Sequence, residues 1–133
     1  MPGGSWTSFS GMTDGQALSG RVLRGINTIY DVATDAGTVR CRIKGKVLKT
    51  SQHGYNPIAP GDVVSLAADP ATPGTGMITS LAARRTTLAR WNRKGRASQV
   101  LAANADLAVC VTSTRSPPFR PRFIDRLAAA AED

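Results

Sequence analysis

The sequence predicts a mainly β fold: a five-stranded barrel, followed by a basic connector and the first strand and helix of an α/β domain. Five short strand patterns lie within residues 20–83, and the turns after the second, third and fourth contain glycine or proline. Long loops follow the third and fourth patterns, and a β-sandwich would need about seven strands. The arrangement therefore fits a small closed barrel of the OB type. The 133 residues suffice for one modest core.

The strands of this barrel can be placed in order along the chain. Residues 1–19, rich in glycine and serine, are predicted to be a flexible tail. Three antiparallel strands are then expected, with a turn signal, Asp-Ala-Gly, before the third. The turn Pro60-Gly61-Asp62 precedes strand four, and a Pro- and Gly-rich loop precedes strand five. The predicted strands are 21–26, 28–34, 38–44, 63–67 and 77–82.

The pattern changes after residue 83. Residues 84–98 are predicted to be a basic connector, and the continuous apolar run Leu107 to Val111 is typical of a strand buried in a parallel sheet. Apolar residues at helical spacing follow it. A strand and a helix are half of a βαβ unit, so we interpret 99–133 as the truncated start of a second domain. Its uncovered apolar faces predict disorder or self-association.

The charge distribution points to a polyanionic partner. The net charge is +8, and two blocks, 40–49 and 84–96, carry basic residues without an acid. RNA or DNA fits better than a membrane, because no basic amphipathic helix accompanies these blocks. No apolar run reaches the roughly 18 residues of a membrane span. Cys41 and Cys110 are expected to be free thiols, and one histidine with two distant cysteines makes no zinc site. We expect a cytoplasmic protein.

Five segments, in this order and spacing, resemble the bacterial ribosome small-subunit-dependent GTPases with a circularly permuted GTPase domain (RsgA/YjeQ-like). The segments cover nearly everything from residue 20 onward. They are "CRIKGK" at 41–46, "NPIAPGDVV" at 56–64, "GMITSLAARRTTLAR" at 76–90, "QVLAANADLAVCVTS" at 99–113 and "PPFRPRFIDRLAAAAED" at 117–133. The resemblance implies an OB barrel, a GTPase domain that uses GTP and magnesium, and a C-terminal region with a structural zinc. It also implies action late in small-subunit maturation, on the small ribosomal subunit and its rRNA.

The sequence departs from that family's pattern in its nucleotide motifs. It contains no Gly-x-x-x-x-Gly-Lys-Ser/Thr loop to cradle phosphates and hold magnesium, and no Asn-Lys-x-Asp to read guanine. We therefore expect an N-terminal fragment that binds RNA, with no nucleotide-binding, metal-binding or catalytic residues of its own. The alternative is a free-standing, translation-factor-like OB protein that binds nucleic acid.

The candidate RNA-binding residues are basic side chains of the predicted third strand, the loop after it, and the connector. In the segment 38–44, apolar Val39, Cys41 and Ile43 alternate with cations, so one face can enter the core while the other meets phosphates. A solvated strand face is the competing interpretation of these cations. For the connector arginines, packing between the barrel and the next domain is the competing interpretation. The candidates are Arg40, Arg42, Lys44, Lys46, Lys49, His53, Arg84, Arg85 and Arg90.

Overall fold

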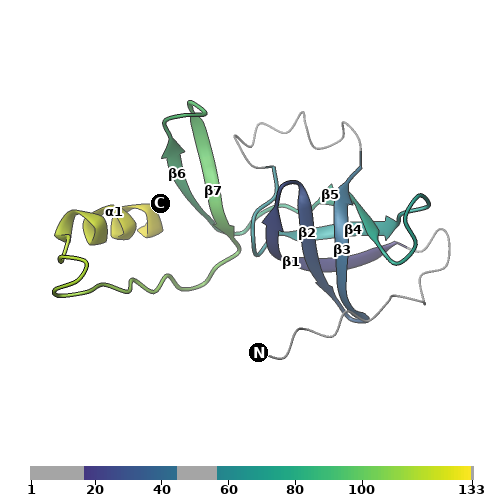
Figure 1. The fold of residues 1–133 in the computed structure, drawn as a ribbon, viewed down its shortest axis with the longest axis horizontal. Coiled ribbons are helices and arrows are strands. Elements are labelled where there is room, and N and C mark those ends of the chain that lie inside the picture. The colour runs from purple at the N-terminus through teal and green to yellow at the C-terminus, as the bar shows by residue number, and fades with distance from the viewer. Residues whose placement is uncertain (1–16, 45–56, 133) are drawn as a thin grey trace.

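The computed structural model describes residues 17–44 and 57–132. Within these ranges the chain forms a five-stranded barrel, a two-stranded hairpin and a helix (Figure 1). The barrel strands are β1 (Leu18–Ile26), β2 (Ile29–Thr34), β3 (Gly37–Ile43), β4 (Val63–Ala68) and β5 (Gly76–Leu81). The hairpin consists of β6 (Thr87–Asn92) and β7 (Ala97–Ala103), and the helix is α1 (Pro121–Glu132).

The barrel is closed, with the strand order β1-β2-β3-β5-β4 and β4 pairing back onto β1. All neighbouring strands are antiparallel except β3 and β5, which run parallel. The predicted barrel is thus confirmed, and each strand lies within a few residues of its predicted position. The β1–β2 turn is tight, because Asn27 and Thr28 both adopt positive φ angles, which match the twist of a two-residue hairpin.

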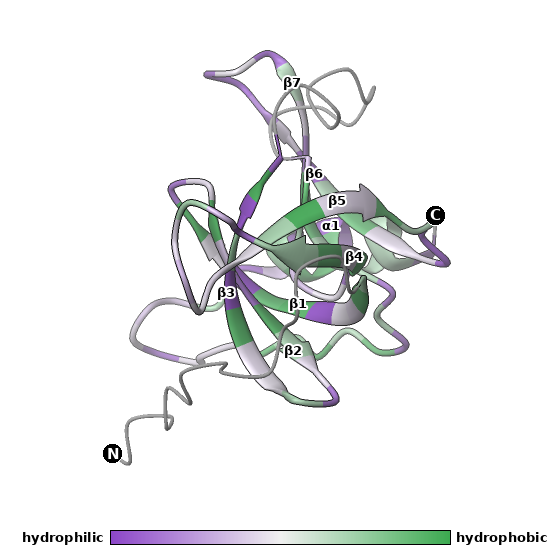
Figure 2. Ribbon diagram, turned by 90° about the vertical axis from the view of Figure 1, so that its right-hand side faces the viewer, coloured by the Kyte–Doolittle hydropathy of each residue, from purple (hydrophilic) through white to green (hydrophobic). Residues whose placement is uncertain are grey.

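The core lies inside the barrel and follows the alternation of its strands. Val22, Val32, Val39, Leu66 and Ile78 are each at most 1% exposed. Hydropathy along the ribbon alternates on β3, where apolar and basic residues follow one another, whereas β4 and β5 are more uniformly apolar (Figure 2). Because successive side chains on a strand point to opposite faces, the other half of each strand is left on the outer surface.

Residues 84–98, expected to be a connector, mostly belong to the β6–β7 hairpin instead. Asn92 ends β6, and its side-chain oxygen accepts hydrogen bonds from the backbone of Lys94 and Gly95 at 3.0 and 3.2 Å, which closes the turn. Arg90 is the one basic residue within these two strands, and Arg93, Lys94 and Arg96 form the turn between them, so the cations of the stretch do not indicate a strand. Figure 1 shows the hairpin projecting from the barrel, with its tip away from the barrel and on the side of α1.

The apolar run Leu107 to Val111 does not form the predicted strand. In the described part of the chain, residues 104–120 contain no strand, and Leu107, Val109 and Val111 are 74–85% exposed. A strand needs a neighbour to satisfy its backbone hydrogen bonds, and none lies beside this run within the described ranges. The predicted helix is present as α1, but none of its residues is buried.

No helix in the described ranges is long and apolar enough to cross a membrane.

Candidate nucleic-acid interface

Strand β3 separates its apolar and basic side chains as the sequence predicts. Val39 and Cys41 are at most 1% exposed, whereas Arg40, Arg42 and Lys44 lie on the outside. Burial raises the pKa of the Cys41 thiol to about 12. The outward row of cations, Arg40, Arg42 and Lys44, is called the β3 cation row below.

A buried acid on the neighbouring strand meets the first member of this row. Asp31 lies opposite Arg40 across the β2–β3 pair and opposite Arg24 across the β1–β2 pair. Its carboxylate accepts a hydrogen bond from Nε of Arg24 at 2.6 Å and lies 3.5 Å from Nε of Arg40. This pairing could have been derived from the sequence, because a two-residue turn at 35–36 places residue 31 opposite residue 40. Neither Asp31 nor Arg24 was predicted as a site residue, because the alternation of β3 alone does not identify its neighbours on β2 and β1.

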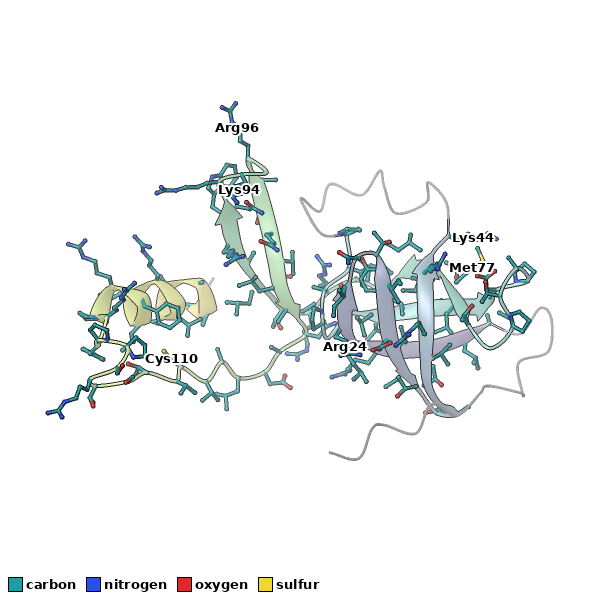
Figure 3. The ribbon with its side chains drawn as sticks, in the orientation of Figure 1. Arg24, Lys44, Met77, Lys94, Arg96 and Cys110 are labelled. Atoms are coloured by element: carbon teal, nitrogen blue, oxygen red, sulfur yellow. The ribbon has the colours of Figure 1, made fainter. Side chains whose placement is uncertain are left out.

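The next outward row is mostly aliphatic. Ile26, Ile29, Arg42 and Met77 face one another across β1, β2, β3 and β5. Ile26 is 61% exposed and Ile29 36% exposed. Lys44 lies beside β5, because its backbone N–H donates to the carbonyl of Ile78 at 3.0 Å; Figure 3 labels Lys44 and Met77 on the barrel. Arg42 therefore sits between uncharged neighbours, and no acid lies in its row.

Arg84, a candidate RNA contact, is instead used within the protein. Its guanidinium makes a bidentate ion pair with Asp62, in which Nε and one terminal nitrogen each lie 2.8 Å from a carboxylate oxygen. The same terminal nitrogen donates to the carbonyl of Pro57 at 3.2 Å. Asp62 is fully buried, and its carboxylate also accepts a hydrogen bond from the backbone of Ala59 at 2.8 Å. Such a geometry leaves Arg84 a packing residue at the base of the hairpin.

The other two connector arginines are exposed. Arg85 pairs with Asp106 and donates to the carbonyl of Asn104 at 3.2 Å, while its side chain stays 59% exposed. Arg90 donates from Nε to Gln99 across the hairpin at 3.2 Å. At the tip of the same hairpin, Lys94 and Arg96 project away from the rest of the molecule (Figure 3). The cations of the hairpin thus form a second group, apart from the β3 cation row.

Three further candidates, Lys46, Lys49 and His53, lie outside the described residues. Within residues 17–44 and 57–132, no cluster of three or more histidine, cysteine, aspartate or glutamate side chains could hold a metal ion.

The comparisons with known proteins agree with one another. Residues 19–78 match the family described as the RsgA N-terminal domain. The small ribosomal subunit biogenesis GTPase RsgA of Borrelia recurrentis is 37% identical over 114 residues, which are 84% of this chain and 36% of that protein. The protein of the same name from Chlorobaculum tepidum is 38% identical over 126 residues, covering 88% of this chain and 40% of the relative. The chain therefore spans well under half the length of these relatives.

Two solved structures share the fold. YjeQ from Thermotoga maritima matches with a TM-score of 0.58 at 22% identity, over 88% of this chain and 37% of that one. YloQ, described as a circularly permuted GTPase, matches with a TM-score of 0.51 at 21% identity, over 84% of this chain and 35% of that one.

Proposed function

This chain belongs to the RsgA family through the domain formed by residues 19–78, and from that premise we propose that its barrel binds small-subunit rRNA during ribosome maturation. The observation that carries the proposal is the β3 cation row on the outer face of a closed barrel. Barrels of this type use strands two and three and the adjoining loops to bind nucleic acid.

On the barrel, phosphate contacts rather than base stacking are the mode that the surface supports. The one aromatic residue in the described barrel strands is Tyr30, and it is 7% exposed, so it offers no face to a base. Proteins that bind single strands without sequence preference usually stack bases on exposed aromatic rings. A folded RNA, recognised by shape and by its phosphates, fits a surface of arginine and lysine better.

Not all the predicted contacts remain in the proposed surface. Arg84 is left out, because its guanidinium is bonded to Asp62 and Pro57. Arg85 and Arg90 stay as proposed contacts, since both are exposed. Lys46, Lys49 and His53 remain predictions from the sequence.

The relatives are named GTPases, but the residues present do not fit GTP or magnesium. None of the 133 residues forms a phosphate-binding loop with the required glycines, lysine and hydroxyl. We assign GTP cleavage in the relatives to sequence outside the part that this chain matches. The alternative of a free-standing OB protein is less well supported, because the RsgA relatives match 84–88% of this chain and so extend beyond the barrel.

The test is binding to purified small ribosomal subunits across a salt series, with wild type and an Arg42→Glu/Lys44→Glu variant. Arg40 is kept, because a glutamate there would face the buried Asp31. The variant should bind at least about tenfold more weakly, and the salt slope should fall by about 1.5 if two phosphate contacts are lost. Arg122→Glu/Arg126→Glu on α1 is the control. It changes the net charge by the same amount, at exposed positions outside the barrel. Equal losses in the two variants would mean that only net charge matters.

A further inference from the structure

We propose that Asp31 is a positioning residue, which holds Arg24 and Arg40 ready for one phosphate of the RNA and so makes Arg24 an additional RNA contact. This inference rests on the proposed function, because it assumes that the barrel face binds RNA. Its parts are a carboxylate and two partly exposed guanidinium groups.

The register of the strands places the three side chains in one line. Arg24, Asp31 and Arg40 come from β1, β2 and β3, and each is the direct cross-strand partner of the next. Side chains that face each other across neighbouring strands lie on the same side of the sheet and within contact distance. The carboxylate in the middle can therefore hold both arginines at once.

Burial distinguishes the centre of this line from its ends. The side chain of Asp31 is 9% exposed, while those of Arg24 and Arg40 are 60% and 48% exposed. The carboxylate contacts each arginine at Nε, the nitrogen nearest the strand. A guanidinium carries five N–H donors in a fixed fork, so an arginine held at Nε keeps a preset orientation for its terminal nitrogens.

The charges at this position do not cancel. One carboxylate faces two guanidinium groups, so these three side chains together carry one net positive charge. The nearest outward row adds Arg42 and two isoleucines but no acid. Aliphatic neighbours lower the local dielectric, which strengthens the attraction for a phosphate. Holding both arginines in place beforehand also reduces the side-chain entropy lost on binding.

An ordinary surface ion pair would show the same distances between Asp31 and the two arginines. It predicts, however, that Asp31→Asn changes RNA binding in the opposite direction. Asp31→Asn removes a negative charge from the face that meets RNA. If Asp31 only offsets positive charge, this variant should bind a polyanion more tightly. If Asp31 positions the arginines, the variant should bind more weakly, although it is more positive.

The experiment measures binding of the 133-residue chain to purified small ribosomal subunits at fixed salt. Asp31→Asn should weaken binding about fivefold, whereas Asp35→Asn, which removes the same charge from the exposed β2–β3 turn, should leave binding equal or slightly tighter. Arg24→Gln should weaken binding more than Arg21→Gln, which removes a cation from an exposed position of the same strand. In the Asp31→Asn background, Arg24→Gln should add little, because the two residues act together.

Two results would overturn the inference while leaving the proposed function intact: Asp31→Asn binding as tightly as Asp35→Asn, or Arg24→Gln behaving like Arg21→Gln. Failure of the proposed function looks different, because wild type would then show no salt-dependent binding or no response to Arg42→Glu/Lys44→Glu. Thermal unfolding of each variant checks that the barrel is intact. If Asp31→Asn does not fold, the comparison of Arg24→Gln with Arg21→Gln decides the question alone.

Discussion

The barrel and the segment 104–132 both contain apolar runs, but only the barrel buries them. Val32, Leu66 and Ile78 are completely buried within the closed sheet. Leu107 and Val111 are 79% and 85% exposed, and no residue of α1 is buried in the described chain. The difference shows that an apolar run becomes a strand only when its backbone finds a partner, because unpaired peptide groups are costly to bury.

Between these two regions, the base of the hairpin is joined tightly to the barrel. The backbone N–H of Ala103 donates to the carbonyl of Pro60 at 2.9 Å, and the side-chain amide of Asn104 donates to that of Gly61 at 3.0 Å. The buried ion pair of Asp62 and Arg84 lies at the same place. The hairpin is thus connected to the barrel more closely than the segment that follows it.

The adjacent arginines 84 and 85 give the largest expected contrast. Arg84→Met should lower the free energy of unfolding by about 3–5 kcal/mol, because it leaves the fully buried carboxylate of Asp62 without its cation. Arg85→Met breaks an exposed pair with Asp106 and should cost about 0–1 kcal/mol. Urea unfolding of both variants measures the difference. Equal costs would show that the junction contributes no more to stability than a surface ion pair.

Two leucines compare the barrel with the later segment directly. Leu66→Ala should cost about 2–5 kcal/mol, since it creates a cavity in a closely packed core. Leu107→Ala should change the free energy of unfolding by about 0.5 kcal/mol or less, because that side chain is 79% exposed. Sedimentation of the same proteins tests the predicted self-association: Leu107→Ala should reduce any concentration-dependent association, and Leu66→Ala should not. A large cost for Leu107→Ala would mean that the segment is packed in solution.

The sequence was sufficient for the barrel because its signals are local. Alternation along β1 to β5 and turn residues at 35–37 and 60–62 identify strands without knowledge of the partners. The hairpin was missed because Arg90 lies within β6 and Arg93, Lys94 and Arg96 form the turn, so the stretch resembles a basic connector. The run Leu107 to Val111 was wrongly predicted to be a strand, since no sequence pattern reports whether a neighbouring strand is available.

The candidate site was predictable in part for the same reason. Which side chains of β3 face outward follows from a period of two, so the β3 cation row could be derived from β3 alone. Pairing needs a second strand: Asp31 against Arg40 follows from the turn register, but Asp62 against Arg84 joins residues that are 22 positions apart. Long-range pairs of that kind arise from barrel closure and from the junction, which local patterns do not describe.

Two glycines with similar backbone conformations test how closely the hairpin joins the barrel. Gly61 and Gly74 have φ angles of +92° and +80°, so an alanine at either position is strained by about 1–2 kcal/mol. A Cβ on Gly61 would also lie 1.9 Å from the carbonyl oxygen of Ala103, whereas a Cβ on Gly74 would meet no atom within 4 Å. Gly61→Ala should therefore cost about 1–3 kcal/mol more than Gly74→Ala in thermal or urea unfolding. Similar costs would indicate that β7 separates easily from the barrel.

The two cysteines compare the barrel with the later segment without any mutation, because one lies in each region. Cys41 is fully buried in the barrel and Cys110 is partly exposed in the later segment, so iodoacetamide at pH 8 should label Cys110 first and Cys41 only when the barrel opens. Burial raises the pKa of Cys41 from its ordinary value of 9.0 to about 12. Between these values an unfolded thiol has lost its proton and the folded one has kept it, so the free energy of unfolding should fall as pH rises through this window. In denaturant both cysteines should react. Rapid labelling of Cys41 in native buffer would show that the barrel opens as readily as the segment, and the contrast between the two regions would then not hold in solution.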